Sequence, residues 1–205
     1  MQLYYHPLSG HSHRVRLFLE LIGEPFELVE IDIRHGQQKS PEFLELNKFG
    51  QVPVLRDDQV VIADSNAILI YLAKKLGRKD WLPEDPRGAA AVQRWLSVAA
   101  GEVAYGVATA RRIRISGAKP VPEEVLSRSY ALLNVLDEEL EKRDWLATSR
   151  PTLADLAIYG YVARAPEGGV DLTDYPYVQA WLCRVESLAG FVPFAKTTVG
   201  MAVSA

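Results

Sequence analysis

The stretch GQVPVLRDDQVVIADSNAILIYLA, residues 50–73, predicts three consecutive elements of secondary structure. QVPVL and VVIA are short apolar runs on either side of the polar turn RDDQ, a pattern typical of a β-hairpin. Pro53 has no backbone N–H to donate, so it must lie at an edge, at a strand start or at a cis bond. The helical pattern that follows has Asp64 or Ser65 to cap its start and Gly77 to end it.

The segment before this stretch adds a strand, a helix, a strand and a further helix. MQLYYH and PFELVEIDI are strand-like runs, and SHRVRLFLELIG between them has the apolar spacing of a helix that ends at Gly23. Strand, helix and strand over this length predict two parallel strands joined by a right-handed crossover. Ser40 and Pro41 supply a cap and a first-turn residue for a helix over SPEFLELN. Residues 1–77 therefore predict one domain with the order β-α-β-α-β-β-α.

The remainder of the chain predicts helices. The charged segment RKDWLPEDP, residues 78–86, contains two prolines and is typical of a linker. Residues 87–205 carry apolar residues at helical spacing with hardly any strand signal, so we expect an all-helical domain and an α+β chain. TLADLAIYGYVA is apolar nearly all round and predicts a buried helix. Thr152 and Asp155 at its start form a capping box, which assigns this carboxylate to the stability of the fold.

The composition is that of an ordinary globular protein. Hydrophobic residues make up 48% and charged residues 24% of the 205 residues, and a net charge of -3 provides no basic field for nucleic acid or an anionic membrane. The one cysteine, Cys183, precludes an internal disulfide and fits a reducing compartment. The sequence shows neither a signal-peptide pattern nor an apolar run long enough to span a bilayer, so we expect a cytoplasmic protein.

Three motifs together resemble the cytosolic glutathione transferase superfamily: GQVPVL (50–55), DSNAILIYLA (64–73) and PTLADLAIYGYVA (151–163). The resemblance covers nearly the whole chain. LYYHPLSGHSHRV, residues 3–15, looks like the serine-type classes (phi, theta and zeta, as in bacterial or plant members) and unlike the tyrosine or cysteine types. The resemblance implies a thioredoxin-like glutathione-binding domain over 1–77, followed by the linker and the helical domain.

The resemblance also implies how two parts of glutathione are bound. In the family the Val52–Pro53 bond is cis, and the backbone N–H and C=O of Val52 pair with the cysteinyl part as an added strand would. Asp64, where the family usually has Glu, would accept from the γ-glutamyl ammonium group. The helix start and the Ser65 hydroxyl would hold the γ-glutamyl carboxylate. Plain capping of the helix by these two residues is the alternative, and both roles can coexist.

The third part of glutathione, its glycyl carboxylate, is implied to lie near the helix that starts at Ser40. Gln38 and Lys39 align with polar and basic positions that hold this group in the family. A solvated Lys39 is the alternative, since an exposed point charge contributes little. Gln51, beside Val52, completes the implied set of glutathione contacts.

Ser9 lies between the first strand and the first helix, and it resembles the serine whose hydroxyl donates to the sulfur of glutathione. The thiolate is the reactive form of a thiol, and a hydroxyl donor together with the positive end of a helix favours it. Ser9 would therefore be a hydrogen-bond donor and not a nucleophile. Ser9 and Ser12 occupy the spacing of a C-x-x-C redox pair, so this segment has no dithiol of its own. We expect Ser12 to cap the helix that follows.

Three histidines, His6, His11 and His13, crowd the same segment. His11 and His13 lack cysteine partners and the i, i+4 spacing of helical zinc ligands, so we expect no metal site. His11 or His13 could act as the base of a serine hydrolase, but the G-x-S-x-G motif that holds the nucleophilic serine of many such enzymes is absent. His11 remains a candidate contact to glutathione or substrate, and Tyr105 is a candidate wall of an acceptor site in the helical domain.

The sequence thus predicts a glutathione transferase that uses glutathione as a co-substrate, with no permanently bound cofactor. Its thiolate would attack a hydrophobic electrophile. The resemblance implies a homodimer, and we expect no nucleic acid or membrane as partner. Two alternatives stay open: a non-catalytic binding or interaction protein with the same fold, and a glutathione-dependent isomerase or peroxidase. SGHSHRV departs from the SSCSWRV of the zeta-type isomerases at several positions, including the cysteine.

Overall fold

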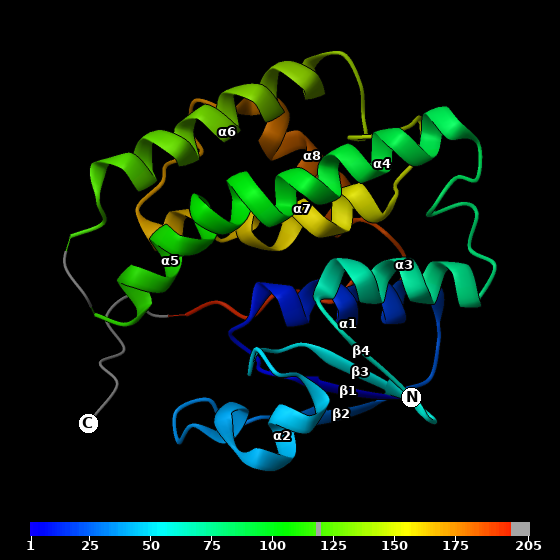
Figure 1. Cartoon of the computed structure of the whole chain (residues 1–205). Coiled ribbons are helices and arrows are strands. Elements are labelled where there is room, and N and C mark those ends of the chain that lie inside the picture. Colours follow the sequence, from blue (N-terminus) through cyan, green and yellow to red (C-terminus); the bar gives the residue numbers. More distant parts are fainter. Residues whose placement is uncertain (118–119, 198–205) are drawn as a thin grey trace. The chain divides into compact units, whose positions relative to one another are not determined.

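The computed structural model describes residues 1–117 and 120–197, which form two compact units (Figure 1). The first unit comprises Met1–Arg78 and Ala189–Ala195, and the second comprises Lys79–Leu188 and resumes at Lys196. The last residues of the predicted helical domain, 198–205, lie outside the described residues. In the ranges that are described, no helix is both long enough and apolar enough to cross a membrane.

The first unit is a four-stranded sheet with helices on both faces. The strand order is β2-β1-β3-β4; β1 and β2 are parallel, and the other two pairs are antiparallel. Helices α1 and α3 cover one face of the sheet and α2 lies on the other (Figure 1). The predicted order of elements is confirmed. In chain order they are β1 (Gln2–Tyr5), α1 (Gly10–Ile22), β2 (Glu27–Glu30), the 3-10 helix η1 (Gln37–Lys39), α2 (Pro41–Leu46), β3 (Val54–Asp57), β4 (Val60–Ala63) and α3 (Ser65–Lys75).

Local chemistry sets the ends of these elements. Gly23 ends α1 with φ 68°, a left-handed conformation that glycine adopts without steric cost. The Ser40 hydroxyl accepts a hydrogen bond from the Phe43 N–H at 3.3 Å and caps α2, as predicted. Pro53 lies directly before β3, whose pairing with both neighbouring strands begins at Val54. The proline therefore removes no donor from the sheet, although β3 is an interior strand.

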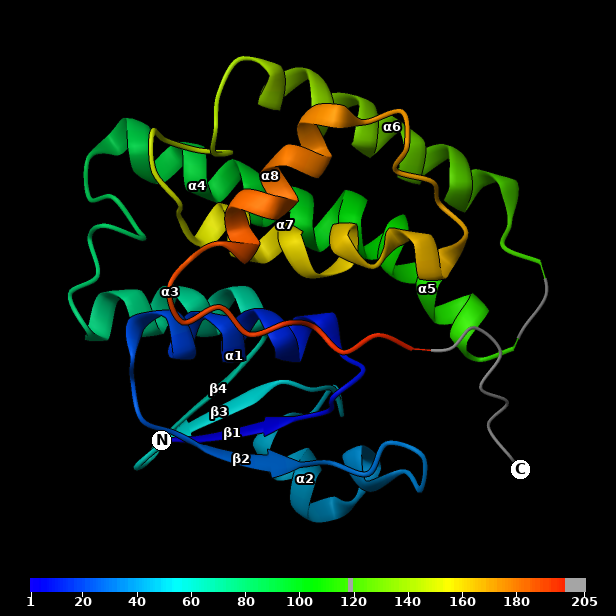
Figure 2. The same cartoon turned by 180° about the vertical axis from the view of Figure 1, so that it is seen from behind.

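The segment Ala189–Ala195 belongs to the first unit. The domain bounds predicted from the sequence had placed it in the helical domain, residues 87–205. The His13 ring donates from Nε2 to the Val192 carbonyl at 2.9 Å, and it stacks on Phe194 with ring centroids 4.9 Å apart. Figure 2 shows this segment running along α1. Contacts between residues so far apart in the chain leave no periodic signal, so pattern reasoning could not assign the segment.

The second unit is helical, and its described residues contain no strand. Helix α7 is buried over nearly its whole length, as its apolar sequence predicts, and the capping box of Thr152 and Asp155 is confirmed. Gly106 separates the π-helical turn from α5. The elements are α4 (Pro86–Val98), the π-helical turn η2 (Ala99–Val103), α5 (Val107–Ile115), α6 (Glu123–Glu141), α7 (Leu153–Ala163), the 3-10 helix η3 (Ala165–Gly168) and α8 (Pro176–Glu186). The predicted α+β class is therefore confirmed.

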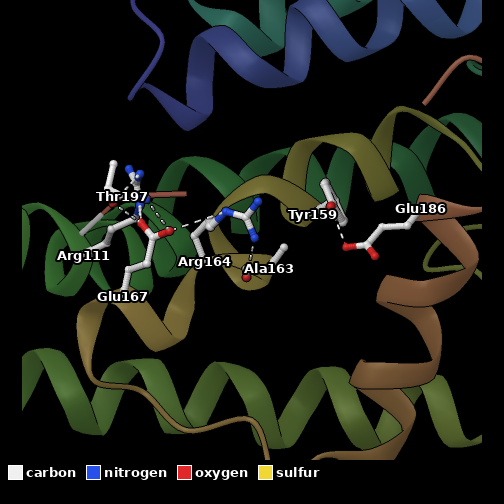
Figure 3. Close-up of polar contacts among 7 residues, drawn as sticks. All are labelled: Arg111, Tyr159, Ala163, Arg164, Glu167, Glu186 and Thr197. Carbon is white, nitrogen blue, oxygen red and sulfur yellow. Dashed lines mark hydrogen bonds and ion pairs between the residues drawn. The ribbon is translucent and has the colours of Figure 1, made fainter. Parts of the chain in front are cut away.

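A largely buried cluster of charged groups surrounds Glu167 in the second unit (Figure 3). The Glu167 carboxylate accepts from Arg111 Nε at 2.7 Å, from the Thr197 N–H at 3.1 Å and from the Thr197 hydroxyl. Arg164 Nε lies 3.5 Å from the same carboxylate. Burial raises the pKa of Glu167, but the hydrogen bonds from Thr197 and Arg111 outweigh it, and the pKa is lowered overall. The cluster ties η3 and α5 to the end of the described chain.

We expect Glu167→Gln to lower the free energy of unfolding by about 3 kcal/mol at neutral pH, because the buried Arg111 loses its ion pair with Glu167. A carboxyl whose pKa is lowered by folding stabilises the fold above its unfolded-state pKa of about 4.3, and this contribution is lost as the pH falls through the folded-state pKa. The difference between Glu167→Gln and the wild type should therefore shrink on acidification. Denaturant unfolding at a series of pH values measures it.

The matched control is Glu102→Gln, which breaks the exposed ion pair between Glu102 and Arg128 at 3.0 Å. Exposed pairs contribute about 0.5 kcal/mol. Equal destabilisation by the two variants would show that burial of the Glu167 cluster has no energetic consequence.

Candidate functional site

The first unit contains a pocket of about 330 Å³ between the loop before β3 and the starts of two helices. His11 lies in the first turn of α1, and Asp64 and Ser65 lie at the start of α3. Most residues predicted to bind a ligand are brought together here. The complete lining is His11, Asn47, Phe49, Gln51, Val52, Pro53, Ala63, Asp64 and Ser65.

The loop over residues 47–53 is organised by the buried side chain of Asn47. Its Nδ2 donates to the Gln51 carbonyl at 2.8 Å, and its Oδ1 accepts from the Phe49 N–H at 3.1 Å. The Val52–Pro53 peptide bond is cis, as expected from the resemblance. Sequence reasoning missed Asn47, because an amide that bonds to loop backbone has no periodicity by which to find it.

Gln38 and Lys39 lie behind this loop and do not line the pocket. Lys39 Nζ donates to the Phe49 carbonyl at 2.9 Å. Gly50 has φ 59°, and a Cβ there would come within 2.6 Å of the Gln38 carbonyl oxygen. Both its backbone conformation and this close approach require glycine. The two predicted residues thus contact the loop that forms one wall of the pocket.

Asp64 is the cap of α3. Its Oδ1 accepts from the Asn66 N–H at 2.9 Å and from the Ala67 N–H at 3.0 Å. Of the two caps predicted for this helix, Asp64 is therefore the one observed. Its backbone has φ 74° and ψ 126°, a conformation that non-glycine residues rarely adopt. Rare backbone conformations cluster at ligand sites, where the surrounding structure holds them. Position and backbone therefore both mark Asp64 as a candidate binding residue.

The cap of α1 is Ser9, and the expectation that Ser12 caps this helix is wrong. The Ser9 Oγ accepts from the Ser12 N–H at 3.1 Å, and Ser9 has the extended backbone of a cap residue. Ser12 lies inside the first turn and is buried, and its Oγ accepts from the His6 N–H at 3.3 Å. Both serines are plausible caps in sequence, and only the point at which the chain turns into the helix separates them. Ser9 lies two residues before His11 and is not among the residues that line the pocket.

His11 connects the starts of α1 and α3. Its Nδ1 lies 3.4 Å from the Ser65 Oγ, which in turn accepts from Arg14 NH1 at 3.3 Å. Burial and then the charge of Arg14 lower the pKa of His11 to about 3, so the ring is neutral near pH 7. Sequence reasoning did not single out Arg14, because its burial is evident only in the structure.

Two other predictions concern Tyr105 and metal binding. Tyr105 lies between η2 and α5 in the second unit and is 66% exposed. Across the part of the chain that the structure describes, no three histidine, cysteine, aspartate or glutamate side chains are grouped as metal ligands would be. The role of Tyr105 as a wall of an acceptor site stays a prediction.

Comparisons with known proteins place this chain among a large set of relatives. Residues 8–75 match the family described as glutathione S-transferase, N-terminal domain, and residues 98–189 match glutathione S-transferase, C-terminal domain. Glutathione S-transferase F13 of Arabidopsis thaliana is 32% identical over 217 aligned residues, covering 100% of this chain and 97% of that protein.

Solved structures of glutathione transferases are similar to this chain in both sequence and fold. The crystal structure of a possible glutathione S-transferase from Rhodopseudomonas palustris is 35% identical, with TM-score 0.86 over 96% of this chain and 98% of that one. Human glutathione transferase theta-2, solved in complex with glutathione, is 30% identical, with TM-score 0.79 over 91% of this chain and 81% of that one.

Proposed function

The chain belongs to the cytosolic glutathione transferase superfamily and is a glutathione S-transferase, and we propose that Ser9 activates glutathione by donating a hydrogen bond to its thiolate. The thiolate forms when the thiol proton passes to solvent. It attacks an electrophilic carbon of a hydrophobic acceptor: the sulfur–carbon bond of the conjugate forms while the bond from that carbon to its leaving group, such as a halide, breaks, and the leaving group departs with the electron pair. Glutathione is the co-substrate, and we propose no permanently bound cofactor.

The pocket of the first unit is the observation that carries glutathione binding by this chain. The backbone at Val52 can pair with an extended peptide as an added strand does. Asp64 caps α3 through one carboxylate oxygen, and the carboxylate has acceptor sites for the γ-glutamyl ammonium group as well. The start of α3, at Ser65, favours a carboxylate through its backbone N–H groups and helix dipole.

Ser9 suits the role of thiolate donor. Its Oγ already accepts the Ser12 N–H as a cap, and a hydroxyl that accepts one hydrogen bond keeps its own hydrogen for donation. The positive end of α1 adds to the stabilisation of negative charge at this point. Ser9 thus lowers the pKa of the bound thiol without becoming a nucleophile.

Gln38 and Lys39 are proposed to hold the glycyl carboxylate, with Gln51 beside them in the loop. Lys39 Nζ donates to the carbonyl of Phe49, which keeps its ammonium group against the loop that forms one wall of the pocket. Its contribution is that of an exposed point charge, so we expect it to assist binding more than catalysis.

The remaining proposals follow from the family. We propose that the chain acts in the cytoplasm on a small electrophile, with Tyr105 at the acceptor site, and that it forms a homodimer. Its domains are proposed to span 1–77 and 87–205 with a linker over 78–86, apart from the segment Ala189–Ala195, which belongs to the first compact unit. Sedimentation at micromolar concentration checks the assembly, since a species with the mass of one chain contradicts it.

Retention on immobilised glutathione followed by an assay with a general aryl halide electrophile tests the function. We expect the wild-type protein to be retained, to be eluted by free glutathione, and to form the conjugate. Retention without conjugation would favour a non-catalytic binding protein. Failure of both would mean that the fold has been put to another use, while activity restricted to isomerisation or peroxide reduction would favour the two enzymatic alternatives.

A further inference from the structure

The side chain of Arg14 joins helix α1 to the start of α3 within the first unit. It is 2% exposed, and its NH1 nitrogen donates to Asn66 Oδ1 at 2.7 Å and to Ser65 Oγ at 3.3 Å. NH1 carries two hydrogens, so each of these two acceptors can take one of them. Ser65 lines the pocket, and the guanidinium group of Arg14 therefore lies one side chain behind the pocket wall.

The start of α3 is less open to a carboxylate than an ordinary helix start, because Asp64 already occupies it. The Asp64 Oδ1 accepts from the N–H groups of Asn66 and Ala67. The Asp64 carbonyl accepts from the Ile68 N–H at 2.9 Å. A ligand carboxylate must then bind to the N–H and the hydroxyl of Ser65, and it meets the negative charge of Asp64, which repels it. A second carboxylate at this helix start therefore needs a positive charge close by.

Arg14 supplies this positive charge, whereas His11 does not. Burial and then the charge of Arg14 lower the pKa of His11 to about 3, so the ring is neutral near pH 7. A guanidinium group stays protonated at any physiological pH, and a buried charge is screened much less than one in water. The shift at His11 means that the charge of Arg14 acts on groups that line the pocket.

The Ser65 hydroxyl carries the effect of Arg14 to the ligand. A guanidinium group can only donate, so the hydroxyl accepts from Arg14 and keeps its own hydrogen for another acceptor. A carboxylate is a stronger acceptor than a neutral imidazole. The His11 Nδ1 lies 3.4 Å from the Ser65 Oγ, a long contact that a bound carboxylate can replace.

We propose that Arg14 makes the start of α3 selective for the α-carboxylate of the γ-glutamyl group. It is a positioning residue, since it fixes Ser65 and Asn66 at the pocket edge and offsets the charge of Asp64 without touching the ligand. This inference rests on the proposed function and deepens it, because it assigns recognition of this carboxylate to a buried residue of another helix. Asp64 remains the acceptor for the γ-glutamyl ammonium group.

Isothermal titration calorimetry with two ligands tests the proposal. The ligands are glutathione and 4-aminobutanoyl-cysteinyl-glycine, which keeps the ammonium group and lacks only the α-carboxylate. We expect the wild-type protein to bind glutathione about a hundredfold more tightly than the analogue, and Arg14→Met to reduce this preference to about tenfold. Arg14→Lys keeps the charge but not the two fixed hydrogens, so it should retain more of the preference while still lowering the melting temperature.

The control is Arg16→Met, which removes the same charge two residues further along α1. Arg16 is partly exposed and pairs with Glu20 at 3.7 Å, so its loss should leave the preference unchanged. Equal losses for both ligands in Arg14→Met would mean that Arg14 only packs the two helices, and would overturn the inference. A wild-type protein that binds both ligands equally overturns the inference but leaves glutathione binding intact. A wild-type protein that binds neither ligand overturns the proposed function as well.

Nitrogen-15 NMR of the arginine side chains tests the proposal in the wild-type protein, in case Arg14→Met does not fold. The guanidinium signals of Arg14 are assigned by their loss in Arg14→Lys or through bonds from its own backbone. We expect saturating glutathione to shift these signals and the saturating analogue to shift them much less. Shifts of equal size with the two ligands overturn the proposal.

Discussion

Ser9→Ala should lower the turnover of a general electrophile about a hundredfold near neutral pH, with much less change in glutathione binding. A shift of two units in the pKa of the bound thiol corresponds to about 2.7 kcal/mol of lost thiolate stabilisation. The proposed contacts hold glutathione mainly through groups other than its sulfur, so we expect its dissociation constant to depend little on Ser9. The pH dependence of kcat/KM measures the effect, because its acidic limb should move to higher pH in the variant.

The structure adds a second effect of this substitution that needs its own control. Ser9 is the cap of α1, and loss of a cap costs about 1 kcal/mol of stability. Asp85→Ala removes the cap of α4, where the carboxylate accepts from the Gly88 N–H at 2.8 Å. It should lower stability similarly and leave the thiol pKa unchanged. Equal turnover for the wild type and Ser9→Ala would contradict the role assigned to Ser9.

Asp155→Ala should lower the free energy of unfolding of the helical unit by about 4 kcal/mol, because it removes the common acceptor of several buried donors. Asp155 is fully buried, and its Oδ1 accepts from the Leu146 N–H and from Trp181 Nε1, each at 3.0 Å. Its Oδ2 accepts from the N–H of Thr152 at 2.9 Å and from the hydroxyl of Thr152. Denaturant unfolding followed by circular dichroism measures the change.

Two comparisons separate this network from an ordinary helix cap. Asp155→Asn replaces one acceptor oxygen by a donor that faces other donors, so we expect it to cost about 2 kcal/mol. Asp171→Ala removes an exposed carboxylate that accepts from Thr173 in a turn, and it should change the unfolding midpoint little. A similar midpoint for Asp155→Ala and Asp171→Ala would contradict the proposed network.

Acid should affect Asp155 and Glu167 differently. Burial raises the pKa of Asp155, although the hydrogen bonds from Leu146, Thr152 and Trp181 oppose the shift. A carboxyl whose pKa is raised by folding takes up its proton first in the folded state, so mild acidification favours the fold. The destabilisation caused by Asp155→Ala should therefore persist on acidification, whereas that caused by Glu167→Gln should shrink.

The elements of the fold were predictable wherever their signals are local. Ser40 lies next to the first turn of the helix that it caps, Gly23 lies next to the last turn of the helix that it ends, and the capping box at Thr152 spans one helical turn. Each such signal is complete within a few residues of sequence. The choice between Ser9 and Ser12 as the cap of α1 was not predictable, because either hydroxyl could have capped a helix that began at a slightly different residue.

The residues that line the candidate pocket were predictable only through the family resemblance. Asp64, Ser65 and Val52 line it, yet in the sequence they are a capping pair and an ordinary strand residue. Asn47, which shapes the loop, and Arg14, which holds Ser65, carried no motif at all. Their roles depend on which groups they meet, and neither composition nor spacing contains that information.

The sequence by itself determined the order of strands and helices, the α+β class and the family, because periodicity, caps and turn residues act over one or two turns of chain. Only the tertiary structure decided which distant residues meet. It brought His13 onto Val192, gathered Glu167 with Arg111 and Thr197, and joined Arg14, Ser65 and His11 at one edge of the pocket. A hydrogen bond or a burial that changes a pKa depends on separations of a few ångströms in space, and residues 30 or more positions apart acquire these only when the whole chain has packed.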